Sequence, residues 1–155
     1  MAILDFKSAG ESSSLQKFKV VENTEPIGFI TPLRFGTQND GLFGMHFDIG
    51  NQIQDNFRNL LLTNHGERLG MFNFGANLRE LTMEHGREAF DSEAITRIRD
   101  AINRHMPFIN PRTFESKQIP GQGGTVERVD IKIVYDVPRL GIVGKEIMIT
   151  LYVRG

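Results

Sequence analysis

Apolar residues recur with a helical period in three stretches of the chain. In the first, about residues 48–63, they lie on one face of a 3.6-residue period: Ile49, Ile53, Phe57, Leu60 and Leu61. Asp48 stands just before this stretch, where a short acidic side chain can accept from free N–H groups of the first turn. The pattern predicts an amphipathic helix with Asp48 as its N-cap.

A second, shorter helix is expected after an aromatic and glycine-rich loop at residues 69–75. It covers about residues 76–84, and its spacing turns Leu78 and Leu81 inward. Gly86 is expected to end it, since glycine readily adopts the left-handed backbone that closes helices.

The third helix is predicted over about residues 92–106. Its apolar positions again form one stripe: Ile95, Ile98, Ala101 and Ile102. Ser92 is the expected cap, and Pro107 is the expected stop because proline cannot donate a main-chain hydrogen bond.

From residue 126 onward the period changes from 3.6 to two. Apolar side chains alternate along two runs that are separated by a break at 138–144: Val129, Ile131, Ile133 and Tyr135, then Ile147, Ile149, Leu151 and Val153. Alternation of this kind predicts two antiparallel strands with one buried face. The fold class expected is α+β, with about three helices packed on a small, mainly antiparallel sheet that includes a C-terminal β-hairpin.

The start of the chain differs from the rest. Residues 1–25 are predicted to be a flexible arm, because Gly10–Ser14 is polar and its flanks show no period. Residues 27–35 are expected to form a short extended segment, followed by a turn at 38–41. Residues 26–155 are then predicted to be a single domain.

The charge and composition of the chain argue against two classes of partner, nucleic acids and membranes. The net charge is −1, so no global field attracts nucleic acid, and no apolar run approaches the roughly 20 residues that cross a bilayer. Cysteine is absent, which removes disulfides and thiolate chemistry. We predict no nucleic-acid partner and no membrane insertion.

No residues are predicted to be catalytic. Two-carboxylate glycosidase chemistry needs one acid with a raised pKa, and the candidates are Glu67, Glu80, Glu84 and Asp91. Glu67 adjoins Arg68, and a neighbouring cation lowers a carboxyl pKa. The three histidines His65, His85 and His105 lack local ligand spacing, so neither a metal nor any other cofactor is expected.

Two arginines follow turns and have defined directions. Gly66 is expected to provide the left-handed turn after the first helix, and Arg68 either caps that helix's free carbonyls, which we favour, or anchors an interface. Pro111 fixes the backbone before Arg112, which suits an interface anchor.

These features also carry a family resemblance. The run Leu60–Arg68, the segment Phe72–Gly75 and the sequence Asn110–Arg112, in this order, resemble the small baseplate wedge protein of contractile phage tails, which has a counterpart in the type VI secretion baseplate. Members were long named tail lysozymes. The resemblance implies a structural subunit rather than an enzyme.

In that family a Glu-Pro-Arg motif docks on a helical core bundle of other wedge subunits. Pro111 and Arg112 match it, and Asn110 stands in place of the glutamate. A structural turn is implied at Gly66, Glu67, Arg68 and Gly75.

The C-terminal strands of the family resemble those of the tail sheath protein and form a template for the first sheath ring. Contact with sheath strands is therefore implied at Ile147, Ile149, Leu151 and Val153. The implied location is the tail baseplate of a virion assembled in the host cytoplasm. Two alternatives stay open: a peptidoglycan-cleaving tail lysozyme, and the type VI secretion subunit.

Overall fold

The computed structural model describes residues 25–37, 41–84, 87–120 and 126–152. The expected arm at 1–25, except for its last residue, most of the turn at 38–41, Gly86 and Val153 lie outside them. The elements, in chain order, are β1 (Gly28–Phe29), β2 (Met45–His46), α1 (Ile49–Leu62), α2 (Leu78–Glu84), α3 (Arg87–His105), β3 (Asn110–Pro120), β4 (Val126–Val137), the 3-10 helix η1 (Pro138–Leu140) and β5 (Ile142–Tyr152).

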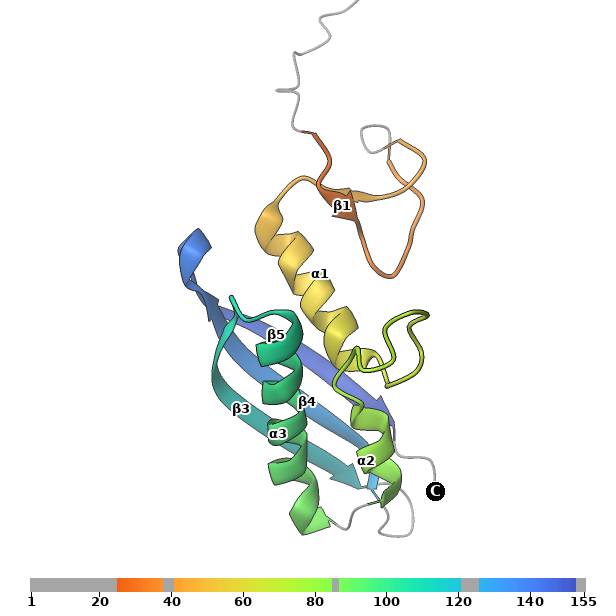
Figure 1. Ribbon diagram of the computed structural model, residues 1–155, viewed down its shortest axis with the longest axis vertical. Helices are drawn as coiled ribbons and strands as arrows, with labels where there is room; N and C mark the ends of the chain where they lie inside the picture. The colour runs from red at the N-terminus through yellow and green to blue at the C-terminus, as the bar shows by residue number, and fades with distance from the viewer. Residues whose placement is uncertain (1–24, 38–40, 85–86, 121–125, 153–155) are drawn as a thin grey trace, which may run out of the picture.

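The three helices lie on one face of an antiparallel sheet with strand order β3-β4-β5 (Figure 1). β1 and β2 form a separate two-stranded sheet beyond the N-terminal end of α1. The predicted α+β class and the C-terminal hairpin are therefore confirmed. None of the helices in the described part of the chain is both long and apolar enough to cross a bilayer.

The core forms where the helices meet the centre of the sheet. The inward side chains of β4 are all buried: Val129, Ile131, Ile133, Tyr135 and Val137. On the helix side, Phe57 of α1 meets Tyr135 edge to face, with ring centroids 5.0 Å apart. Aromatic pairs favour this geometry because the positive ring edge faces the negative ring face.

α1 begins where it was predicted, but the residue of its first turn that faces the sheet is Gly50 rather than Ile49. The Asp48 carboxylate accepts from the Asn51 N–H at 2.9 Å, which confirms the N-cap. Ile49, expected on the buried face, is instead 46% exposed. The first turn presents Gly50 to the sheet, and a Cβ there would lie 3.1 Å from Ile142 Cδ1. The glycine thus leaves room for the Ile142 side chain of β5 at this end of the helix.

The end of α1 corrects two expectations. The helix stops at Leu62 with Thr63 extended, so Gly66 is not its closing residue. The free carbonyls of Leu60 and Thr63 accept from main-chain N–H groups of residues 76 and 77, at 3.1 and 3.3 Å, rather than from Arg68. The chain returns to cap its own helix, which sequence spacing alone does not reveal.

α3 begins at Arg87, five residues before the predicted start, so Ser92 lies inside the helix and does not cap it. The reason is that the buried stripe extends further back, through Ala94 to Phe90. The expected stop is confirmed, since the helix ends at His105, two residues before Pro107.

Sequence periodicity missed strand β3. The turn expected at Pro111 is instead the beginning of a strand, which pairs with β4 from Asn110↔Asp136 onward. β3 is an edge strand with few apolar side chains, and its Ser116 hydroxyl donates to the Asp91 carboxylate of α3 at 2.6 Å. A polar edge strand lacks the alternation that identifies a half-buried one.

Side-chain hydrogen bonds from Asp55 and Asn59 fasten the β1–β2 segment to α1, and the Asn59 amide donates to the Thr31 hydroxyl at 3.2 Å. Asp55 accepts from the Thr31 N–H at 2.9 Å and contacts His46 Nε2 at 2.7 Å. Burial raises the pKa of Asp55, but these hydrogen bonds and the charge of His46 outweigh it, so the pKa lies below its ordinary value.

We expect Gly75→Ala to destabilise the protein by at least about 2 kcal/mol. Its φ is +109°, and a Cβ would lie 2.1 Å from the Thr63 carbonyl oxygen, so both strain and collision oppose a side chain. Urea unfolding measures the loss. Gly70→Ala is the matched control: its φ is +79°, but no atom lies within 4 Å, so only the strain of about 1 kcal/mol is expected. Equal losses would show that the contact with Thr63 is unimportant.

Candidate partner-binding surfaces

The predicted anchor Arg112 lies where the β3–β4 register shifts, between Pro111 and Thr113. Its Nε donates to the carboxylate of Asp136, which is 10% exposed, whereas the Arg112 side chain is 59% exposed. The other Asp136 oxygen accepts from the Gly144 N–H at 2.7 Å. One carboxylate therefore joins three strands and orients the guanidinium outward.

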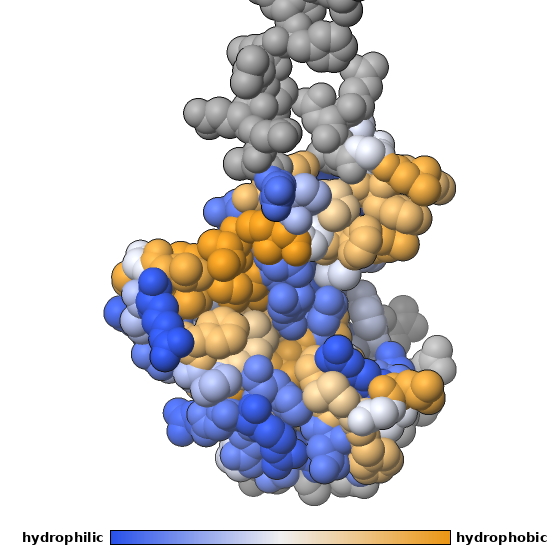
Figure 2. Space-filling view, turned by 45° about the horizontal axis from the view of Figure 1, so that its top comes forward, coloured by the Kyte–Doolittle hydropathy of each residue, from blue (hydrophilic) through white to orange (hydrophobic). Residues whose placement is uncertain are grey.

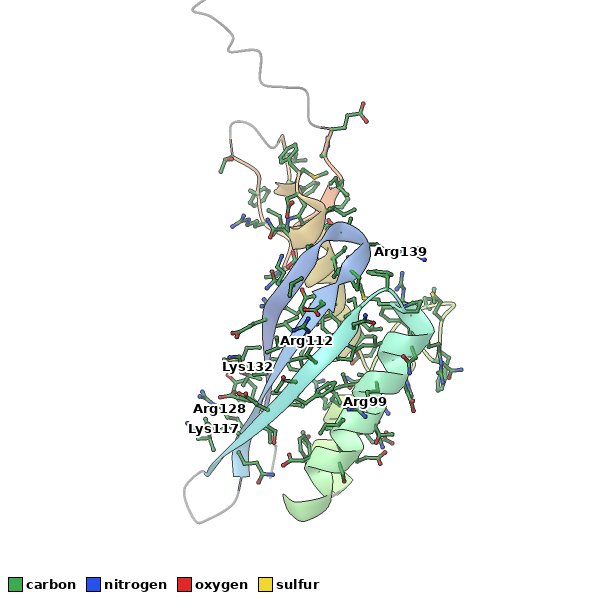
Figure 3. The ribbon with its side chains drawn as sticks, turned by 90° about the vertical axis from the view of Figure 1, so that its left-hand side faces the viewer. Arg99, Arg112, Lys117, Arg128, Lys132 and Arg139 are labelled. Carbon is green, nitrogen blue, oxygen red and sulfur yellow. The ribbon has the colours of Figure 1, made fainter. Side chains whose placement is uncertain are left out.

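Figure 3 shows how the basic side chains are distributed around this position. Arg139 lies at the tip of the β4–β5 hairpin, and Arg112 lies below it on the sheet. Further along, the cations are paired: Lys132 contacts Glu146 at 3.0 Å and Arg128 contacts Asp130 at 3.3 Å. At this end, Lys145 is hydrogen-bonded to the Gly50 carbonyl at 2.9 Å. Arg112 stays largely exposed despite its bond to Asp136, and no ion pair joins the exposed Arg139 to a carboxylate of the described residues, so these two arginines are the cations open to a partner.

Apolar side chains accompany the cations at the hairpin tip. Leu140 and Val143 are exposed there, and so are Phe47 and Ile49 at the start of α1, which Ile142 contacts over Gly50. Figure 2 shows several apolar patches on the surface of the molecule. Sequence periodicity does not single out Arg139, Leu140 and Val143, because a break between two strands ordinarily indicates a simple turn. The signal for an exposed apolar tip was the three large apolar residues within this break, Leu140, Ile142 and Val143.

The residues predicted to touch sheath strands have another place. Ile147, Ile149 and Leu151 are buried beneath the helices, and Val153 lies outside the described residues. What β5 leaves open is its main chain, because β4 is its only partner in the described sheet. Gln54 Nε2 lies 3.4 Å from the carbonyl oxygen of Glu146, a long contact. Any contact with an added strand would therefore use the backbone of β5.

In the expected structural turn, the neighbouring residues Glu67 and Arg68 do not pair with each other but contact other residues. The Glu67 carboxylate accepts from the main-chain N–H and from the side-chain amide of Asn64, both at 2.8 Å. These two hydrogen bonds lower the Glu67 pKa, with a smaller contribution from the charge of Arg79. Arg68 stacks on the Phe74 ring, 4.3 Å from its centroid. The direction predicted for the Glu67 pKa holds, but its cause differs.

All three glycines of this turn, Gly66, Gly70 and Gly75, have left-handed backbones. Gly66 has φ +83°, and its N–H donates to the carbonyl of Phe72 at 2.8 Å, which closes the loop. Gly75 packs directly on the Thr63 carbonyl. The loop exposes Leu69 completely, and Phe72 to 69%. The segment is thus a rigid turn with an apolar tip.

The remaining candidate acids are committed to neighbours. Glu80 accepts from Arg97 at 2.8 Å and from the Asn77 amide. Asp91 accepts from Ser116, and the side chain of Glu84 lies outside the described residues. In the described ranges, no group of three or more His, Asp or Glu side chains is placed to hold a metal ion.

Comparison with known proteins identifies the fold. No curated protein matches the chain. Among solved structures, a crystal structure assigned as a tail lysozyme of Geobacter sulfurreducens has a TM-score of 0.58 at 18% identity, covering 70% of this chain and 94% of that one. A chain of the anti-feeding prophage baseplate, from electron cryo-microscopy, has a TM-score of 0.51 at 16% identity, covering 82% and 85%.

A family model gives the assignment. The model described as "Baseplate wedge protein gp25" matches residues 48–139, which is more than half of the chain. The matched range holds α1, the turn at 66–75, α3 and the whole of β3 and β4. It therefore includes Arg112 with its partner Asp136. The chain belongs to the gp25 family of baseplate wedge proteins, structural components of contractile injection systems.

Proposed function

We propose that this protein is a wedge subunit that links the helical core bundle of the baseplate wedge to the first ring of the tail sheath, and so initiates sheath assembly. The observation that carries the proposal is that one sheet presents two unlike surfaces. One is the cationic and apolar end around Arg112, and the other is the free edge of β5. We place it in the tail baseplate of a virion assembled in the host cytoplasm.

The docking half of the proposal rests on charge. Asn110 brings no charge of its own, so recognition of the core bundle falls to Arg112 and Arg139. Arg112 keeps donors free beyond its bond to Asp136, and Leu140 and Val143 supply apolar contact beside it. A helical bundle with acidic side chains flanking an apolar stripe fits this surface, because arginine binds carboxylates through a planar fork.

We expect Arg112→Gln combined with Arg139→Glu to reduce incorporation into wedges at least tenfold. Loss of a hydrogen-bonded charge pair at an interface costs about 2–5 kcal/mol. Arg112→Gln is preferred to Arg112→Glu, which would place a second carboxylate against Asp136. Wedge complexes purified from cells that express the complete tail cluster report incorporation by mass spectrometry.

Lys117→Gln is the matched control for that experiment, since Lys117 lies on the same sheet at the end far from the hairpin tip (Figure 3). Circular dichroism of each purified variant checks that it folds. Wild-type incorporation of the double variant would overturn the docking assignment.

The sheath half of the proposal rests on main-chain groups. β5 is 11 residues long, and its pairing with β4 is regular from Lys145 to Tyr152. Long edges with unpaired N–H and C=O groups accept further strands. The Gln54 contact places the Glu146 carbonyl on the free side, and alternation then turns the main-chain groups of Met148 and Thr150 the same way.

We expect Met148→Pro to abolish sheath assembly, because it removes an edge N–H while leaving the pairs of Ile147 and Ile149 with β4. Met148 is 59% exposed, so its side chain is not needed by the core. Negative-stain micrographs count sheathed tails. Met148→Thr keeps the N–H and should assemble normally. Sheathed tails in normal number with Met148→Pro would contradict a role for this edge.

We propose further that the protein does not cleave peptidoglycan. A glycosidase acid needs a raised pKa and a second carboxylate across a cleft. Glu67 has a lowered pKa, and Glu80 and Asp91 are hydrogen-bonded to neighbours. Family membership supports a structural role, although one similar structure carries the tail lysozyme name.

The purified protein is expected to leave a suspension of bacterial cell walls turbid, because none of these acids is prepared to protonate a glycosidic oxygen. Turbidity is followed over hours at high protein concentration beside a known lysozyme. Glu67→Gln is the paired variant. Clearing by the wild type that Glu67→Gln removes would establish the enzyme instead.

A further inference from the structure

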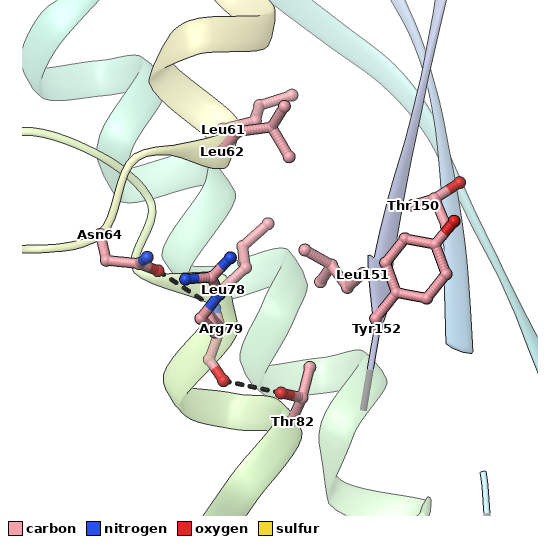
Figure 4. Close-up of a pocket in the computed structure, with 9 residues that line it drawn as sticks. All are labelled: Leu61, Leu62, Asn64, Leu78, Arg79, Thr82, Thr150, Leu151 and Tyr152. Carbon is pink, nitrogen blue, oxygen red and sulfur yellow. Dashed lines mark hydrogen bonds between the residues drawn. The ribbon is translucent and has the colours of Figure 1, made fainter. Parts of the chain in front are cut away.

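A pocket of about 490 Å³ opens beside the C-terminal half of β5 (Figure 4). It lies between this strand, the end of α1 and the start of α2. Its lining residues are Leu61, Leu62, Asn64, Leu78, Arg79, Thr82, Thr150, Leu151 and Tyr152. None of the contacts assigned above to docking uses this pocket.

The pocket opens at the edge of the sheet rather than on one of its faces. Leu151 points toward the helices and is buried, while Thr150 and Tyr152 belong to the opposite face of β5. A cavity lined by consecutive residues of one strand reaches around that strand's free side. A strand added to β5 would pass over the pocket, and every second side chain of that strand would face it.

The lining of the pocket is apolar at its floor and cationic at its rim. Leu61 and Leu78 are fully or almost fully buried and form an apolar floor, while Arg79 is exposed at the rim. Figure 4 shows the guanidinium of Arg79 directed along the pocket. No hydrogen bond joins it to a carboxylate of the described residues, although its charge contributes to the lowered pKa of Glu67. The floor suits an aliphatic or aromatic side chain, and the rim suits a carboxylate.

We propose that this pocket is the register-setting site for the sheath strand that pairs with β5. An apolar side chain of that strand fills the pocket, and an acidic side chain two positions away pairs with Arg79. The inference rests on the proposed function, because it assumes that a strand of the sheath protein occupies the edge. It adds the side-chain chemistry that selects one register among those that main-chain pairing permits.

Register selection needs such a site. Main-chain hydrogen bonds are the same for any pair of strands, and a slip of one residue turns every side chain to the other face. The outward side chains near the end of β5 are uncharged: Met148, Thr150 and Tyr152. A pocket with an apolar floor and a cationic rim therefore supplies the specificity that the edge alone lacks.

We expect Thr82→Trp, which fills the pocket, to reduce the number of sheathed tails at least tenfold while wedge incorporation stays normal. Thr96→Trp is the matched control. Both threonines lie on helices and donate to a main-chain carbonyl of their own helix, at 2.7 Å for Thr82 and 2.9 Å for Thr96, but Thr96 does not line the pocket. Arg79→Glu is expected to act like Thr82→Trp, and reversal of the partner acid to lysine should restore assembly.

The occupant is identified by photo-crosslinking in assembled tails. The reactive amino acid p-benzoylphenylalanine replaces Tyr152, an exposed aromatic at the pocket, and replaces Phe72 in the turn as the control. The expected product at position 152 is a crosslink to a strand of the sheath protein, located by mass spectrometry. A crosslink to residues 1–24 or 153–155 of this chain, or to another baseplate subunit, would overturn the proposal.

The two proposals fail differently. Loss of sheath with Met148→Pro, but normal sheath with both Thr82→Trp and Arg79→Glu, rejects the pocket and keeps the edge. Normal sheath with all three variants rejects both.

Discussion

The packing of α1 on the helix-covered face of the sheet, over β5 and the central strand β4, is the interaction on which the rest of the structure depends. β4 has a neighbour on each side in the described sheet, and its inward side chains are buried from Val129 to Val137. The contact of Phe57 with Tyr135 joins the centre of the helix to the centre of the sheet. Because burial of apolar surface is the dominant favourable term in folding, this one face determines which side of every strand is available to others.

In the described part of the chain, the helices cover one face of the three-stranded sheet, and no other strand pairs with its two edges. The outer face is occupied by ion pairs such as Lys132 with Glu146 and by the Asp130–Thr150 hydrogen bond. Pairs at the surface contribute little to stability, but they keep a sheet face soluble. The edges cannot be neutralised in this way, since their polar groups belong to the backbone. A protein of this design is suited to being extended by further strands.

The same sheet connects the two proposed interfaces. Asp136 holds Arg112 of β3 and the Gly144 N–H of β5 with one carboxylate, so the docking end and the start of the free edge share a residue. The pocket beside Leu151 lies at the opposite end of that strand, which separates the choice of register from docking.

The amino-acid sequence by itself determined what depends on periodicity and on chain neighbours. The apolar face of α1, the cap at Asp48, the stop before Pro107 and the alternation of β4 and β5 all follow from spacing within one element. The family resemblance, too, came from short motifs in a fixed order. These signals are local, because each reflects how one helix or strand places its side chains.

Only the tertiary structure decided the rest. Strand β3 has too few apolar residues to be recognised from its sequence pattern. It forms because its backbone can hydrogen-bond to β4. Arg112 meets Asp136 across 24 positions, and the carbonyl of Leu60 meets residue 76 across a loop. Ile147, Ile149 and Leu151, predicted to touch a partner, have side chains that are buried in the core, so a partner would meet the backbone of this strand. Periodicity shows that one face of a strand or helix is apolar. Whether that face is buried in the core or contacts a partner depends on which elements pack against it.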